Sequence, residues 1–182
     1  MIILTGFEKF SLFSENISES FTKSFPQSIQ NIPIVKKILP VSWINSIENY
    51  RNLLCSLKQY PKLVVLTGVY SGKKILIERY AWNLAIGLDN SNKYKIGFIN
   101  LAEPFRKKSS LDLEILISYI NKPKKISVSS FPGFYLCNYI YFWALSLGKG
   151  NYPVIFIHLP SSVNIRRLKR NLVNIIKIIF NY

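Results

Sequence analysis

The sequence is poor in cysteine and histidine, and it has no long apolar run. Its 182 residues include one histidine and two cysteines. Two cysteines with no pairing pattern exclude a disulfide-rich secreted domain and agree with a reducing compartment. No apolar run reaches the roughly 20 residues of a membrane-spanning helix, and the first residues lack the basic segment of a signal peptide. We therefore expect a cytoplasmic protein.

Acidic residues are also scarce. Nine Asp and Glu stand against 24 Lys and Arg, which gives a net charge of +15, and a sequence isoelectric point near 9.9 is typical of proteins that contact nucleic acid. The basic residues are scattered, however, without an RNA-binding motif, zinc-ligand spacing or basic–aromatic repeat. We therefore expect a solvated basic surface, with a nucleic-acid partner as the less favoured alternative. The basic clusters lie at residues 36–37, 73–74, 106–108, 122–125 and 166–170.

Apolar residues are plentiful, and their spacing alternates between that of strands and that of helices. Hydrophobic residues make up 49% of the chain, which excludes disorder. The pattern predicts one α/β domain over residues 1–182, an α/β/α sandwich with a largely parallel sheet. We expect strands at 2–7, 34–41, 63–68 (ending in a glycine turn), 75–77, 96–99, 125–129 and 154–158. We expect helices from Trp43 to Leu57, from a capping box at 109–112 to Ile120, over 137–147 and from Ile165 to Ile179, and a loop at 89–95.

Cys137 lies where a turn leads into a predicted helix. A helix N-terminus carries partial positive charge and free N–H groups, which favour a thiolate and would stabilise an oxyanion beside it. Free cysteine is also among the most buried residue types, so composition alone favours a structural role. The other cysteine, Cys55, lies beside the apolar face of the helix that begins near Trp43, and we expect it to pack there.

His158 and Glu78 each end a predicted strand. Strand ends and helix starts face the same crevice of an α/β fold, so His158 could act as general base for Cys137. A lone histidine can equally be structural. A carboxylate at the end of an apolar strand needs a partner. For Glu78 that partner is either Arg79 or a nearby lysine, or the His158 ring, whose tautomer the carboxylate would hold.

Four segments resemble motifs of one enzyme family, pyroglutamyl peptidase I, which consists of cysteine peptidases. TGFEKF at residues 5–10 resembles the family's TGFxPF opening, and ERYAWN at 78–83 resembles its ERxAxN segment. GFYLCN at 133–138 resembles the GTFVCN nucleophile segment, and FIHLP at 156–160 resembles FIHxP. The four occur in the family's order, so together they indicate common ancestry.

The resemblance implies a fold, a site and a substrate. The fold is an α/β/α sandwich with a mixed sheet, and the catalytic residues are Glu78, Cys137 and His158, with Arg79 and Asn83 orienting neighbouring groups. No metal or organic cofactor is needed, the substrates are N-terminally pyroglutamylated peptides, and a homo-oligomer is possible. By position in the motifs, the substrate-binding residues are Phe7, Phe10, Tyr135 and Leu136.

Other positions depart from the family pattern, and two alternatives follow. Ser11-Leu12 replace a glycine pair, and the turn at 68–73 loses a glutamine and one glycine. A glycine lost where backbone approaches a ligand changes the pocket. The chain could therefore be a related thiol hydrolase with a different amide substrate. It could also be a non-catalytic protein on the same scaffold that binds nucleic acid through its positive charge.

Overall fold

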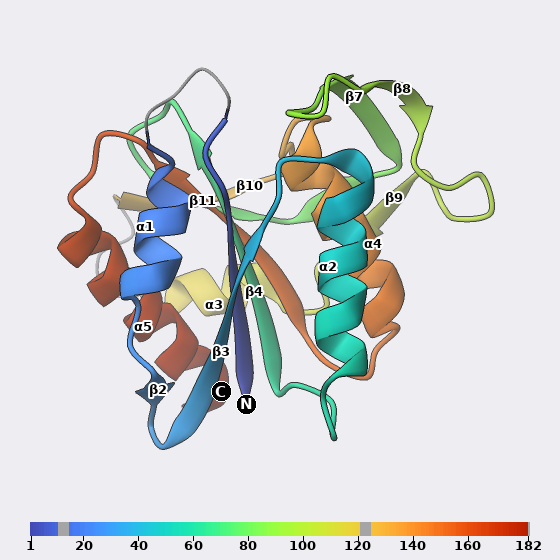
Figure 1. The fold of residues 1–182 in the computed structure, drawn as a ribbon. Coiled ribbons are helices and arrows are strands. Elements are labelled where there is room, and N and C mark those ends of the chain that lie inside the picture. The colour runs from blue at the N-terminus through green and yellow to red at the C-terminus, as the bar shows by residue number, and fades with distance from the viewer. Residues whose placement is uncertain (11–14, 121–124, 182) are drawn as a thin grey trace.

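A seven-stranded sheet forms the centre of the protein, whose computed structural model describes residues 1–10, 15–120 and 125–181 (Figure 1). The strand order is β10-β5-β11-β4-β1-β3-β2. β5 runs antiparallel to β11, β2 runs antiparallel to β3, and the other neighbours are parallel. The predicted mixed, largely parallel sheet is therefore confirmed. Its strands are β1 (Ile2–Phe7), β2 (Ser28–Ile29), β3 (Ile32–Leu39), β4 (Leu63–Tyr70), β5 (Ile75–Glu78), β10 (Ile126–Ser129) and β11 (Val154–Pro160).

Helices cover both faces of the sheet, as the apolar periodicity predicts (Figure 1). Three of them, α1 (Ile17–Ser24), α3 (Leu113–Ser118) and α5 (Ile165–Asn181), pack on one face together with Ile2 and Leu4 of β1. The other two, α2 (Trp43–Cys55) and α4 (Leu136–Gly148), pack on the opposite face together with Ile3. Successive strand residues point to opposite faces, so each buried strand supplies side chains to both cores. Within the described ranges, none of the helices combines the length and apolar character that a membrane crossing requires.

Two small antiparallel ribbons lie outside the central sheet. β6 (Tyr80–Trp82) pairs with β9 (Arg106–Lys108), and β7 (Leu84–Leu88) pairs with β8 (Tyr94–Phe98). The sequence predicts only the strand near 96–99 and the loop at 89–95. The structure confirms a turn between β7 and β8, but β8 begins at Tyr94, so the last two residues of the predicted loop belong to the strand. These ribbons escape prediction because they are short and half-exposed, so they have no long buried apolar run.

Three local predictions are wrong. Gly68 lies inside β4 rather than in a turn after it, because pairing with β11 continues the strand to Tyr70, beyond Leu66, where its pairing with β1 ends. The capping box at 109–112 does not form, because Asp112 is itself the N-cap of α3 and accepts from the Glu114 and Ile115 amides. The helix also ends at Ser118, before Ile120.

Cys55 does not pack in the core as predicted, because it is exposed. α2 buries Trp43, Ile47 and Tyr50 along one face, and Cys55 is the last helical residue. Each residue turns the helix by about 100°, so five residues after Tyr50 the side chain has left the buried face. Cys55 is therefore accessible to reagents.

Candidate active site

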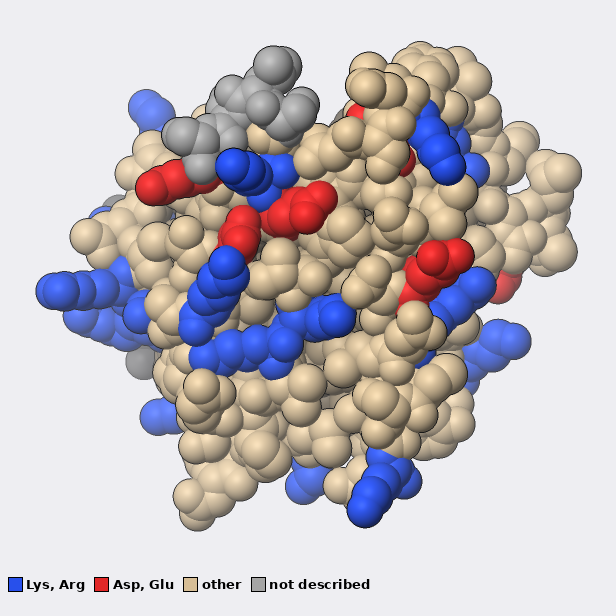
Figure 2. Space-filling model, in the orientation of Figure 1, with Lys and Arg blue, Asp and Glu red and all other residues tan. Residues whose placement is uncertain are grey.

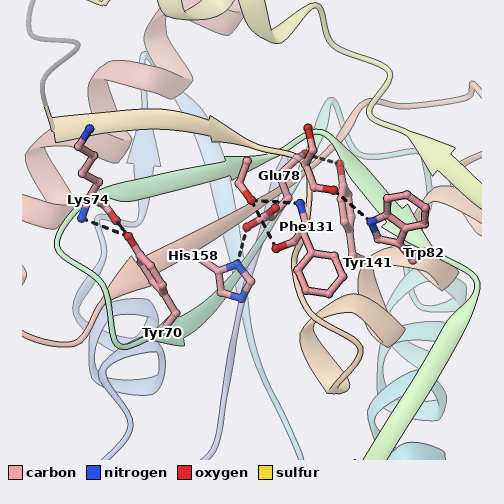
Figure 3. A network of polar contacts seen from close by, with 9 residues as sticks. Tyr70, Lys74, Glu78, Trp82, Phe131, Tyr141 and His158 are labelled. Carbon is pink, nitrogen blue, oxygen red and sulfur yellow. Dashed lines mark hydrogen bonds and ion pairs between the residues drawn. The ribbon is translucent and has the colours of Figure 1, made fainter. Parts of the chain in front are cut away.

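The strand pair β5–β11 brings Glu78 and His158 together. His158 Nδ1 lies 2.7 Å from Glu78 Oε1, and Figure 3 shows the two side chains pointing toward each other. Glu78 is fully buried and His158 is 6% exposed. Arg79, the alternative partner of Glu78, instead forms an ion pair with Glu114. The predicted contact between the carboxylate and the imidazole is therefore present.

Cys137 lies beside the same histidine, in the first turn of α4. Gly68 pairs with His158 between β4 and β11. A Cβ atom on Gly68 would lie 2.6 Å from Cys137 Sγ, so the thiol rests directly on this glycine. Strand register and helix start thus bring all three predicted catalytic side chains to one place.

Hydrogen bonding makes the imidazole of His158 unusually basic. Burial alone would lower the pKa of His158, but hydrogen bonding with Cys137 and with Glu78 outweighs burial and raises it from 6.5 to about 9. The ring is then a cation at neutral pH. An imidazolium beside a cysteine favours the thiolate, which is the nucleophilic form. Since Glu78 occupies Nδ1, the other ring nitrogen, Nε2, is left to face the thiol.

The start of α4 supplies free amide groups next to the thiol. The first backbone hydrogen bond of this helix runs from the Tyr139 amide to the Tyr135 carbonyl. The amides of Leu136, Cys137 and Asn138 precede that bond, so they have no partner within the helix. Such N–H groups, together with the helix dipole, can stabilise negative charge on a carbonyl oxygen beside Cys137.

Asn138 ties the nucleophile helix to the β6–β7 segment. Its side-chain oxygen accepts from the Trp82 amide at 2.7 Å, and its side-chain nitrogen donates to the Trp82 and Leu84 carbonyls at 2.7 and 2.8 Å. Asn138 is fully buried, so these bonds have no competition from water. This positioning role was missed in the sequence, although the residue directly follows Cys137 in its motif.

Two aromatic rings pack against the His158 ring. The Phe156 ring centroid lies 4.9 Å from that of the imidazole, and the Tyr70 centroid lies 5.8 Å from it. The Tyr70 hydroxyl is in turn held by the Lys74 amide, as Figure 3 shows. These contacts restrict the ring orientation that Glu78 sets. Phe156 opens the FIHLP motif, but no pattern in the sequence predicts that it or Tyr70 packs on the imidazole, because these contacts depend on strand register.

The four predicted substrate-binding residues fall into two groups. Phe10 and Tyr135 are partly exposed, and their rings stack with centroids 5.7 Å apart. Phe7 and Leu136 are 3% and 1% exposed and belong to the apolar core beneath. Only Phe10 and Tyr135 are therefore placed to touch a substrate with much of their side chains.

The β7–β8 ribbon stands over Tyr135. The Tyr135 hydroxyl donates to the Leu88 carbonyl at 2.7 Å, and Gly87 lies so close to the Tyr135 ring that a Cβ atom would be 2.6 Å away. Asp89, which is buried, holds the base of the ribbon by accepting from the amides of Trp43 and Lys93. The ribbon and Tyr135 therefore pack together as one unit, which the hydrogen bonds of Asp89 hold in place.

Asn83 organises a loop, as its motif position suggests. Its side chain accepts from the Ile99 and Asn100 amides and donates to the Asn100 and Glu103 carbonyls. None of these hydrogen bonds joins Asn83 to Glu78. Ser11 and Leu12, which replace the family's glycine pair, lie outside the described residues. Within the described part of the chain, no three His, Cys, Asp or Glu side chains are grouped closely enough to hold a metal ion.

Gly68→Ala should reduce activity without unfolding the protein. The new methyl group would displace Cys137 Sγ, and a shift of about 1 Å at a reacting atom can lower the rate by about 10²-fold. The measurement is kcat/KM for a pyroglutamyl amide together with the melting temperature. Gly148→Ala is the matched control, because its methyl group would meet no atom closer than 3.3 Å. A Gly68→Ala protein with normal kcat/KM would show that the thiol does not rest on this glycine.

Comparison with known proteins identifies the family. The sequence profile described as "Pyroglutamyl peptidase" matches residues 1–173. The pyrrolidone-carboxylate peptidase of Thermosipho melanesiensis is 30% identical, with 93% of this chain and 87% of that protein covered. The solved pyrrolidone carboxyl peptidases of Thermococcus litoralis and Thermus thermophilus superpose with TM-scores of 0.91 and 0.89 at 24% and 23% identity. The alignments cover 100% and 97% of this chain and 93% and 99% of theirs, which establishes the shared fold. The chain therefore belongs to the pyroglutamyl peptidase family.

Proposed function

We propose that this protein is a cysteine exopeptidase that removes an N-terminal pyroglutamyl residue from peptides. The observation that carries the proposal is the convergence of a first-turn helix thiol, a buried histidine and a buried glutamate in a chain of this family. A nucleophile, a base in hydrogen-bonding contact with it and a carboxylate that orients the base form the arrangement required for covalent acyl transfer. The alternative of a non-catalytic protein does not account for this arrangement.

In the first half of the reaction, the Cys137 thiolate attacks the carbonyl carbon of the pyroglutamyl residue. The C–S bond forms, and the carbonyl electron pair moves onto oxygen, where the first amides of α4 stabilise the charge. As the intermediate collapses, the His158 imidazolium transfers the proton on Nε2 to the leaving nitrogen, and the C–N bond breaks. The remaining peptide leaves as a free amine, and a thioester remains on Cys137.

In the second half, water hydrolyses the thioester. The imidazole, now neutral, takes a proton from water while the water oxygen attacks the thioester carbonyl. Collapse breaks the C–S bond and releases pyroglutamate, and the thiolate–imidazolium pair is restored. Glu78 holds Nδ1 throughout, so Nε2 faces the reacting atoms in both steps.

The direct test compares two substrates with one leaving group. A pyroglutamyl amide of a fluorescent amine should be hydrolysed, and the corresponding prolyl amide should not. The prolyl ring has the same size, but it lacks the lactam carbonyl and carries a protonated amine at neutral pH in place of the neutral lactam N–H. A site that hydrogen-bonds a substrate group rejects an analogue without it by up to about 10⁴–10⁵-fold. Equal turnover of both amides would contradict pyroglutamyl specificity, and turnover of neither by a thiol-active protein would favour a different amide substrate.

Phe10→Ala should weaken kcat/KM for the pyroglutamyl amide by roughly 1–3 kcal/mol, the usual value of an apolar contact in a specificity pocket. We propose that Phe10 and Tyr135 form the aromatic wall of the ring-binding slot, over a base that contains Phe7 and Leu136. The stacked, partly exposed pair supports this placement. Alkylation of Cys137 by iodoacetamide should barely change, since α4 and His158 set that reactivity. Normal turnover in Phe10→Ala would remove Phe10 from the pocket, and a parallel fall in melting temperature would make it a core residue.

Glu78→Gln should lower kcat/KM by roughly 10²–10⁴-fold and shift its pH profile, by analogy with loss of the orienting acid of a serine-protease triad. The His158 pKa of about 9 lies above the 6.5 of a free histidine, so the imidazolium form is lost as pH rises through about 9. Activity should therefore fall on the alkaline side near pH 9. Without the carboxylate the pKa of His158 falls, and the alkaline limb moves to lower pH. If the alkaline limb of the pH profile stayed where it is in the wild type, Glu78 would not act through His158.

We further propose that the enzyme works in the cytoplasm and as a homo-oligomer. Catalysis needs Cys137 as a free thiol, which a reducing compartment preserves. The outer face of the β7–β8 ribbon supports self-association, because Leu88, Ile96 and Phe98 are 53%, 71% and 50% exposed. An apolar face of this kind is typical of an interaction surface.

A further inference from the structure

The positive charge of the chain is concentrated toward its C-terminal end. Glu114 is the last acidic residue of the sequence, and the 17 residues of α5 contain five basic residues. Arginine is more concentrated than lysine, since three of the six arginines of the chain lie in α5, namely Arg166, Arg167 and Arg170. A general bias of the composition toward lysine would not place half of the arginines of the chain in one helix. Figure 2 shows Lys and Arg gathered at the left side of the molecule, where α5 lies in Figure 1.

The fold joins these arginines to basic residues from distant segments. A depression between α5 and β10 is lined by Lys125, Lys177 and the three arginines. A neighbouring depression is lined by Lys73, Lys125 and Arg167. The two share Lys125, Arg167 and Asn171, so they form one continuous surface. We call this surface the basic groove, and its cations are Lys73, Lys125, Arg166, Arg167, Arg170 and Lys177.

The charge of the basic groove is not neutralised within the described part of the chain. No acidic side chain is among the residues that line it, and none of its cations forms an ion pair there. Arg166 and Arg167 also lie in the first turn of α5, where cations oppose the helix dipole. Repulsion among these groups destabilises the free protein, and an anion bound in the groove would relieve it.

We propose that the basic groove binds the phosphate backbone of double-stranded nucleic acid without reading its sequence. The arginine side chain presents paired donors that match a phosphate group, and the exposed arginines in the first two turns of α5 can contact neighbouring phosphates. The lining contains no aromatic residue on which the bases of a single strand could stack. The apolar face of α5 is occupied by the core, through Leu168, Leu172 and Ile176, so the helix cannot insert it into a membrane.

The test measures binding of a fluorescent DNA duplex at several salt concentrations between about 50 and 200 mM. The full chain should bind, and the logarithm of its affinity should fall linearly with the logarithm of salt concentration. The variant R166Q/R167Q/R170Q should bind at least tenfold more weakly at the lowest salt and have a slope shallower by about 3, one unit per lost phosphate contact. R166K/R167K/R170K should keep most of the slope and lose part of the affinity, because charge remains while the paired donors are lost.

The matched control removes the same charge elsewhere. K58Q/K62Q/K108Q changes three exposed lysines outside the groove and should bind with nearly the wild-type affinity and slope. Melting temperatures establish that each variant is folded. Equal losses in the two glutamine variants would overturn the proposal, because binding would then depend on net charge alone. Absence of duplex binding by the wild type would overturn it too. That remains so if vesicles containing phosphatidylserine bind through the same arginines, because the ligand of the groove would then be a membrane surface.

Discussion

Cys137→Ser should reduce hydrolysis of a pyroglutamyl amide by about 10⁴-fold or more, which is a loss of at least about 5.5 kcal/mol of transition-state stabilisation. A hydroxyl is far harder to ionise than a thiol, and the cationic His158 ring beside it is suited to a thiolate. The substitution replaces sulfur by a smaller atom above Gly68, so no overpacking arises there. The melting temperature should therefore stay close to that of the wild type while turnover disappears.

Cys55→Ser is the matched control, since Cys55 is the other free cysteine and is exposed at the end of α2. This variant should keep full activity and full sensitivity to iodoacetamide. Cys137→Ser should still be alkylated, but only at Cys55. Substantial activity in Cys137→Ser that is abolished by alkylation of Cys55 would show that Cys55, and not Cys137, is the nucleophile.

His158→Ala should lower turnover about as much as loss of the nucleophile, because the members of a catalytic triad act as a unit. The change removes both the cation that favours the thiolate and the proton donor for the leaving amine. It also leaves the fully buried Glu78 carboxylate without its partner, which can destabilise a protein by about 3–5 kcal/mol. The measurement is therefore kcat/KM together with thermal unfolding.

His158→Gln separates the catalytic from the structural effect. The glutamine amide can donate to Glu78, so stability should recover in part, but it cannot exchange a proton at neutral pH. We expect turnover to remain as low as in His158→Ala, and alkylation of Cys137 at neutral pH to be slower than in the wild type. Recovery of activity in His158→Gln would mean that the histidine only supports the fold.

The sequence predicts those parts of the fold that have strong local patterns. The apolar run at residues 2–7 predicts β1, and helical spacing of apolar residues predicts α2, α4 and α5. Glu78, Cys137 and His158 were singled out because each lies at the end of a predicted element, where side chains of an α/β fold converge. Their assignment as catalytic residues came from the resemblance of their motifs to those of the family. That residues 1–182 form one domain remains a prediction.

Features that depend on strand register or on long-range packing were not predictable. The contact between Gly68 and Cys137 Sγ requires β4 to continue past the glycine, whereas a glycine after an apolar run suggests a turn. Cys55 was misplaced because periodicity does not show where a helix ends. The basic groove was missed because Lys73, Lys125 and the arginines of α5 are scattered in sequence and meet only in the fold.

The most direct test of the central claim is covalent labelling with a chloromethyl ketone that carries the pyroglutamyl group. This reagent needs both a ring-binding slot and a reactive thiol beside it. We predict that one equivalent attaches, that peptide mapping places it on Cys137, and that a pyroglutamyl peptide slows the reaction. The prolyl analogue should label far more slowly. Labelling at Cys55, or equal labelling of Cys137 by both reagents, would contradict the assignment of this site as a pyroglutamyl peptidase.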